Sequence, residues 1–209
     1  MPVLAALIAT VFLLTFLAAP GLGAGWFWDI GAGLGFLALA GMLAQTLPWR
    51  ARNGLRAHER LGYAVLGVAI AHAFWLPGGD GAVRTYLGPG APLHMWLGVG
   101  ALLGVGALTL LARMPDRRKL HRDHRAFRRA HRLLGLGVVG GATGHVVLSR
   151  FYLGTAVQVA LLVALALAIG LGRRHWTRLG PERAAPVGGF FAAGAVAIGV
   201  FVAARSLLA

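Results

Sequence analysis

The sequence contains no cysteine. A chain without cysteine has no disulfide framework, no thiolate nucleophile and no zinc or iron–sulfur site with cysteine ligands. Charged residues are scarce too: they make up 12% of the 209 residues, whereas hydrophobic residues make up 58%. A soluble domain has about 25% charged and about 45–50% apolar residues. The composition therefore excludes an ordinary water-soluble globule, and it equally excludes a disordered or collagen-like chain.

Acidic side chains are the rarest charged group, with 6 Asp and Glu against 20 Lys and Arg and a formal net charge of +14. The sequence also has no paired-carboxylate site, no Ser-His-Asp set and no HExxH motif. A balance this basic is typical of proteins that bind nucleic acid or an anionic membrane surface. The positions of the basic residues decide between these two partners.

The apolar residues gather in seven segments, each close to the roughly 20 residues that a membrane-spanning helix needs. The sequence therefore predicts an all-α integral membrane protein, a bundle of about seven transmembrane helices in a single domain over residues 1–209. We expect the first segment to be retained, because residues 1–3 lack the basic side chain that begins a signal peptide. The segments are residues 2–20, 26–47, 57–76, 93–114, 128–151, 155–171 and 187–208.

The Lys and Arg residues gather in alternate connections between these segments. Because basic residues accumulate on the cytoplasmic side of a membrane, this pattern predicts a cytoplasmic N-terminus and an outer C-terminus, in a bacterial inner (plasma) membrane. It also accounts for the basic run at residues 117–132, so we expect membrane lipids and no nucleic acid as partners. The three basic connections contain Arg50, Arg52, Arg56 and Arg60; Arg113, Arg117, Arg118, Lys119, Arg122, Arg125, Arg128, Arg129 and Arg132; and Arg173, Arg174, Arg178 and Arg183.

Four histidines lie in apolar segments, where ionisable residues mark function by default. His58 and His72 lie on the third segment, and His131 and His145 lie on the fifth. Both spacings are 14 residues, or about four helical turns, so each pair falls on one helix face about 21 Å apart along the axis. Two such helices side by side offer two levels, each with one imidazole from each helix.

Two facing imidazoles at each level suit two low-spin b-type haems, because imidazole is a good axial ligand of iron. We expect His58 and His131 to hold the inner iron, and His72 and His145 to hold the outer iron. Arginines near these levels are expected to pair with haem propionates, and glycines to leave space for the macrocycle. The arginines are Arg56, Arg60 and Arg132 at the inner level and Arg150 at the outer one; the glycines are Gly62, Gly67, Gly135, Gly137, Gly140, Gly141 and Gly144.

Simpler explanations exist for the same residues. A membrane histidine often only bonds a neighbouring helix, and the glycines around 137–141 fit the close-packing pattern small-xxx-small. On that interpretation the chain is a haem-free transporter or structural protein, and its histidines are packing or proton-relay groups. The stretch 31–35 (GAGLG) looks like a dinucleotide loop, but no strand precedes it, so we interpret its glycines as packing residues. Asp29 is interpreted as a helix-cap or loop residue.

No catalytic residue is assigned. His94 begins the fourth segment on the outer side and is a weak candidate for gating or protonating an external acceptor; it is equally well explained as an interfacial histidine beside Trp96. His121 and His124 lie in the basic connection after the fourth segment. They are interpreted as solvated residues, although their spacing of one helical turn would also allow weak metal binding.

At these histidines the sequence resembles the ferric reductase-like transmembrane domain family, which includes ferric reductases and NADPH oxidases. The points of match are residues 58–62 (HERLG) followed by His72, and residues 127–135 (FRRAHRLLG) followed by His145. The resemblance covers roughly residues 26–171. It implies a six-helix bis-haem core, with 187–208 as an extra C-terminal helix. It also implies that electrons pass from cytosolic NAD(P)H through FAD and two b-type haems to an external acceptor.

The sequence departs from the family after residue 171, because a further apolar segment stands where family reductases continue into an FAD- and nicotinamide-binding domain. We therefore expect an oxidoreductase component that receives electrons from a separate cytoplasmic flavoprotein or from quinol, with FAD and NAD(P)H only in the partner. Its acceptor would be a ferric chelate, oxygen or a periplasmic protein, and its basic face could dock an acidic donor. The alternative is a haem-binding membrane subunit for a periplasmic methionine-sulfoxide reductase. His58 speaks against that group, whose corresponding helix lacks the inner histidine.

Overall fold

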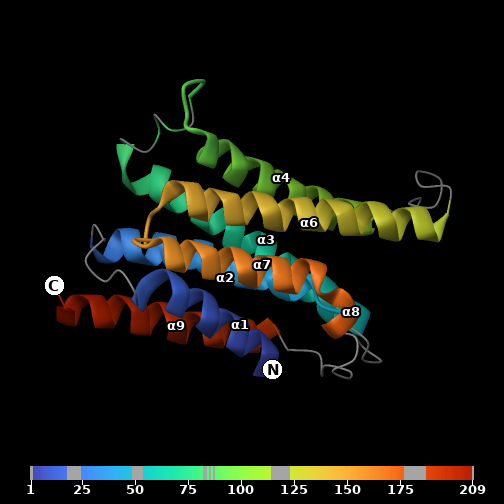
Figure 1. The fold of residues 1–209 in the computed structure, drawn as a ribbon. Coiled ribbons are helices and arrows are strands. Elements are labelled where there is room, and N and C mark those ends of the chain that lie inside the picture. The colour runs from blue at the N-terminus through green and yellow to red at the C-terminus, as the bar shows by residue number, and fades with distance from the viewer. Residues whose placement is uncertain are drawn as a thin grey trace.

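In the computed structural model, every regular element of the described residues is a helix. The described residues are 2–17, 25–48, 54–81, 84, 86, 88–113, 123–176 and 187–208. The elements are α1 (Pro2–Phe12), η1 (Leu13–Leu17), α2 (Trp26–Thr46), α3 (Gly54–Gly79), α4 (Leu93–Arg113), α6 (His124–Ser149), α7 (Ala156–Leu171), α8 (Arg173–Trp176) and α9 (Val187–Leu208). The all-helical prediction is therefore confirmed over this part of the chain (Figure 1).

Five of these helices are long and apolar enough to cross a membrane: α2, α3, α4, α6 and α9. The first and sixth predicted segments form shorter apolar helices, Pro2–Thr15 and Ala156–Leu171. At a rise of about 1.5 Å per residue, α7 is about 24 Å long, less than the roughly 30 Å of a bilayer's hydrocarbon core. The architecture is thus a helical membrane bundle with five candidate spans rather than the expected seven.

Capping residues set where several of these helices begin. The side chain of Asp123 accepts a hydrogen bond from the Ala126 N–H at 2.6 Å, so α6 begins at His124, four residues before the predicted start. Thr155 and Gln158 form a capping box that begins α7. At the C-terminal end of α3, Pro77 lies inside the last turn, and the helix ends at Gly79 instead of the predicted residue 76.

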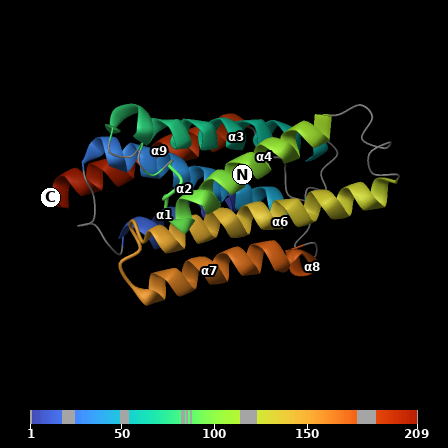
Figure 2. The same ribbon diagram turned by 90° about the horizontal axis from the view of Figure 1, so that it is seen from above.

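Four helices, α2, α3, α4 and α6, form a four-cornered bundle. Around its perimeter α2 packs against α3, α3 against α4, α4 against α6, and α6 against α2. In Figure 1 α4 lies above α2, and in Figure 2 α3 and α6 lie on either side of α4. The histidine-bearing helices α3 and α6 therefore occupy opposite corners and run parallel. They are not the side-by-side neighbours that the sequence interpretation assumed.

The remaining helices cover the outside of this bundle. α1 and α9 pack against each other and against α2, and α7 packs against α6. Six of the most deeply buried side chains lie on α1, α2 and α9: Ile8, Val11, Leu39, Leu43, Phe190 and Phe201. Helix α2 is therefore the central element, with the α1–α9 layer on one side and the other three bundle helices, α3, α4 and α6, on the other.

Most of the described arginines lie at one end of the bundle, where α3 and α6 begin and α4 ends; we call this the basic end (Figure 1). Its side chains are exposed, and most of them have no acidic neighbour in the sequence. The arginines whose side chains are described at the basic end are Arg56, Arg60, Arg113, Arg125, Arg128, Arg129 and Arg132, and those of the opposite end are Arg84, Arg150 and Arg205.

Candidate cofactor site

The structure brings the four apolar-segment histidines together in two pairs across the bundle. The ring centres of His58 and His131 lie 6.2 Å apart near the basic end, and those of His72 and His145 lie 6.3 Å apart toward the opposite end. All four side chains are partly buried. Because α3 and α6 stand at opposite corners, both pairs lie between helices that do not otherwise pack along each other.

The separation within each pair fits two ligands on one iron. Two imidazole nitrogens on opposite sides of one metal ion lie about 4 Å apart, because each metal–imidazole bond is about 2.0 Å long. Each ring centre lies about 1 Å behind its nitrogen, so ligand rings facing each other have centres about 6 Å apart. Both observed separations agree with this value.

The tautomer of the His72/His145 pair is set by hydrogen bonds to backbone. His72 Nδ1 lies 2.8 Å from the Gly31 carbonyl oxygen, and His145 Nδ1 lies 2.7 Å from the His94 carbonyl oxygen. Because a carbonyl oxygen can only accept, each Nδ1 carries the proton and each Nε2 carries the lone pair. Among the described residues neither Nε2 has a hydrogen-bond partner. Haem and metal ligands have this arrangement, with one nitrogen anchored and the other available.

A cavity of about 490 Å³ surrounds the His72/His145 pair. Its wall comes from all four bundle helices and is mostly apolar, as is usual for cofactor pockets of this size. Besides the two histidines, its lining includes Trp28, Phe36, His94 and Tyr152. The cavity and the two available nitrogens together suit a flat, largely apolar group with a metal at its centre.

The His58/His131 pair has a different surrounding. His131 Nδ1 is buried, and no hydrogen-bond partner for it exists among the described residues; the Phe127 ring lies 5.6 Å from the imidazole. The contact from α2 goes to the His58 backbone, where Gln45 Nε2 donates to the carbonyl oxygen at 2.9 Å. Beside the pair, the exposed Glu59 carboxylate lies 3.7 Å from Arg113.

The glycines expected to make room for a macrocycle fall into two groups. A Cβ on Gly67, Gly135, Gly137 or Gly140 would meet nothing within 4 Å, but Gly67, Gly137 and Gly140 are exposed and none of the four lines the cavity at His72 and His145. A Cβ on the other three would meet a packed neighbour: Gln45 for Gly62, the Leu97 carbonyl oxygen for Gly141 and the Leu97 side chain for Gly144. Gly141 and Gly144 are thus close-packing residues against α4.

The remaining predicted site residues lie as follows. Arg60 and Arg132 are exposed and lie within two residues of His58 and His131, while Arg150 is the exposed, left-handed C-cap of α6, with φ 53°. The His94 ring lies 5.9 Å from the His145 ring. His121 and the side chain of His124 lie outside the described residues. Within the described ranges, no set of three His, Asp or Glu side chains could hold a bare metal ion.

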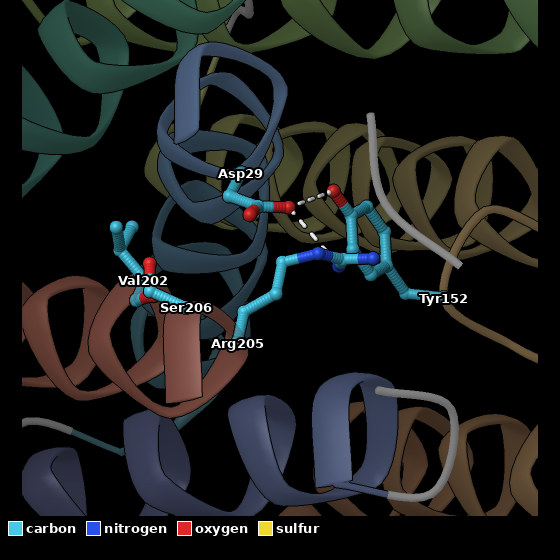
Figure 3. A network of polar contacts seen from close by, with 5 residues as sticks. All are labelled: Asp29, Tyr152, Val202, Arg205 and Ser206. Carbon is cyan, nitrogen blue, oxygen red and sulfur yellow. Dashed lines mark hydrogen bonds and ion pairs between the residues drawn. The ribbon is translucent and has the colours of Figure 1, made fainter. Parts of the chain in front are cut away.

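Sequence reasoning missed a buried ion pair next to the cavity (Figure 3). Asp29 of α2, interpreted as a cap residue, is 1% exposed and accepts from Arg205 Nη1 of α9 at 3.1 Å and from the Tyr152 hydroxyl at 2.7 Å. Tyr152 is fully buried, has φ 63°, and lies outside the spanning helices. Burial, and then its bond to Asp29, raise the pKa of this tyrosine, so the hydroxyl stays protonated and donates. The sequence signal that could have indicated this ion pair is that Asp29 and Arg205 each stand alone as a charged residue in an apolar segment.

Comparison with known proteins adds no relative. The chain matches no family model, no curated protein and no solved structure. The assignment of a function therefore depends on the two histidine pairs and their surroundings.

Proposed function

We propose that this chain is a membrane-embedded electron carrier that holds two b-type haems, one at each histidine pair, within a ferric reductase-like core over residues 26–171. The observation that carries the proposal is the repeated pair geometry. At two levels of one four-helix bundle, an imidazole from α3 faces an imidazole from α6 with ring centres 6.2 and 6.3 Å apart.

The ligand residues have separate tasks. When bound, a b-type haem supplies a reversible one-electron couple at its iron. The two histidines of each pair would hold the iron from α3 and from α6, and ligation by two histidines would favour electron transfer over the binding of gas or substrate. The hydrogen bonds of His72 and His145 hold the rings in one orientation. The mostly apolar cavity wall would exclude water, and the exposed Arg60, Arg132 and Arg150 are the proposed partners of the propionates.

The direction of transfer follows from the charge distribution. The basic end is proposed to face the cytoplasm, in agreement with the positive-inside rule, with the C-terminus outside a bacterial inner membrane. Electrons would enter at His58/His131 from a separate flavoprotein or from quinol and leave from His72/His145 to an external acceptor. The exposed arginines of the basic end would attract an acidic donor.

The decisive measurement is the haem content of purified protein. A reduced-minus-oxidised spectrum should show b-type bands, and the haem assay should give two haems per chain. His72→Ala and His145→Ala should each remove one haem and leave the other, while His175→Ala, which changes an exposed histidine of α8, should remove none. If the purified protein contains no haem, the haem proposal is refuted and the histidines are packing or proton-relay groups. If His72→Ala and His145→Ala both retain two haems, the proposed ligand pairing is refuted.

The acceptor can be identified in vesicles that contain the purified protein and a reduced flavoprotein inside. Reduction of an external ferric chelate without any added protein supports a ferric reductase-like component. If reduction begins only when a periplasmic reductase is added, the chain is instead the membrane subunit of a two-protein system.

A further inference from the structure

We propose that Gly35 and Gly98 are positioning residues, each of which lets a neighbouring helix hold one imidazole of the His72/His145 pair through a backbone carbonyl. This inference rests on the proposed haem function for its consequence, but its geometry can be tested separately. The two glycines lie on α2 and α4, the two bundle corners that carry no ligand.

The first contact joins α2 to α3. Gly31 supplies the carbonyl that accepts from His72 Nδ1 at 2.8 Å, and Gly35 lies one helical turn further along α2. A Cβ on Gly35 would lie 2.7 Å from Cε1, 2.9 Å from Nδ1 and 3.0 Å from Nε2 of His72. Side-chain carbon atoms do not approach ring atoms this closely, so any larger residue at position 35 moves the imidazole.

The second contact joins α4 to α6 and has the same design. His94 supplies the carbonyl that accepts from His145 Nδ1 at 2.7 Å, and Gly98 again lies four residues later. A Cβ on Gly98 would lie 2.9 Å from His145 Nδ1 and 3.2 Å from its Cε1. His94 therefore acts on His145 through its backbone, which is a different role from the one its side chain suggested.

Helix geometry explains the spacing of four. In an α-helix the carbonyl of residue i already accepts from the N–H of residue i+4, but its second lone pair remains open. Because Cβ atoms tilt toward the helix N-terminus, the side chain of residue i+4 covers that lone pair. A glycine at i+4 exposes the carbonyl and also makes room for the ring that bonds to it.

At the other level the corresponding contact is missing for His131 over the described residues. His131 Nδ1 has no hydrogen-bond partner there. A carbonyl that accepts from Nδ1–H makes an imidazole a more basic ligand, which stabilises the oxidised metal. We therefore infer that the two haems differ in reduction potential, and that Gly35 and Gly98 lower the potential at the His72/His145 level.

The test compares Gly35→Ala and Gly98→Ala with the control Gly100→Ala. Gly100 lies on α4 like Gly98, but a Cβ there would meet nothing within 4 Å. Losing such a supporting contact typically weakens metal binding about 10- to 100-fold. Each test variant should therefore bind the haem at the His72/His145 level more weakly than the control variant does. Where that haem is retained, its midpoint potential should rise while the other potential stays unchanged.

A second measurement does not depend on haem. Nitrogen chemical shifts of histidine in the haem-free protein should assign the Nδ1–H tautomer to His72 and His145, and Gly98→Ala should change the His145 signal alone. Test variants with control-like haem affinity, potentials and histidine signals would overturn the positioning proposal. Wild-type protein that binds no haem but keeps both Nδ1–H tautomers would instead overturn the haem function and leave the carbonyl contacts standing.

Discussion

Removing Arg205 should destabilise the bundle more than removing any exposed arginine. The perturbation is Arg205→Met, which keeps an apolar side chain of similar length in α9. In the native protein the Asp29 carboxylate is 1% exposed and has two donors, Arg205 at 3.1 Å and Tyr152 at 2.7 Å. The substitution leaves a buried carboxylate with one donor and no counter-charge.

The expected magnitude follows from this burial. Breaking a buried ion pair by removing one partner costs about 3–5 kcal/mol of unfolding free energy. For a chain of this size each kcal/mol shifts Tm by about 2–4 °C, so Tm should fall by roughly 6–20 °C. Removing both charges, in Asp29→Asn with Arg205→Met, should cost less than the Arg205→Met single variant, because no lone charge remains buried.

The assay is a double-mutant cycle on purified protein in detergent, with thermal unfolding followed by circular dichroism. Arg84→Met is the matched control, since Arg84 is exposed at the same end and should change stability by no more than about 0.5 kcal/mol. Additive effects of the two single substitutions, or an Arg205→Met variant as stable as the control, would show that the pair does not support the bundle.

Two further predictions concern single hydrogen bonds. Tyr152→Phe removes the second donor to Asp29 and should lower the unfolding free energy by about 1–3 kcal/mol. The pKa of Tyr152 is raised in the folded protein, so its contribution to the unfolding free energy is complete below the unfolded pKa of about 10 and is lost as the pH rises above that value. Wild type and Tyr152→Phe should therefore converge in stability at alkaline pH. Stability curves that stay parallel across the pH range would contradict this. Asp123→Ala removes the N-cap of α6 and should cost about 1 kcal/mol. Hydrogen exchange should then be faster in the first turn of α6 and unchanged at the capping box of α7; equal exchange in both would contradict the role of Asp123.

Local signals in the sequence predicted the helices well. Apolar runs located all the long helices, and the ends of the sixth segment agree with α7 because Thr155 and Gly172 are recognisable caps. The structure gives this run a helix of 16 residues, shorter than the five candidate spans, because hydropathy marks where a helix is apolar and not whether its length matches a bilayer. The start of α6 was missed because its first turns are basic, and a hydropathy window excludes them.

The histidine pairs could be expected because one spacing occurs twice, on two helices with the same orientation. Periodicity places a residue on a helix face, but it does not say which helix lies opposite, so the diagonal arrangement of α3 and α6 needed the structure. The carbonyl partners were out of reach for the same reason. Gly31 and His72 are 41 residues apart, and His94 and His145 are 51 residues apart. The glycines of α2 were recognised as packing residues without any sign of what they pack against.

The ion pair between α2 and α9 has a consequence for biosynthesis. Asp29 and Arg205 are 176 residues apart, and ribosomes add about 5–20 residues per second, so roughly 9–35 s pass between the synthesis of the acid and that of its partner. During this time the nascent chain has an intramembrane carboxylate without its counter-ion. The counter-charge arrives only with α9, so the contact that joins α9 to α2 cannot form before this helix has been made and inserted.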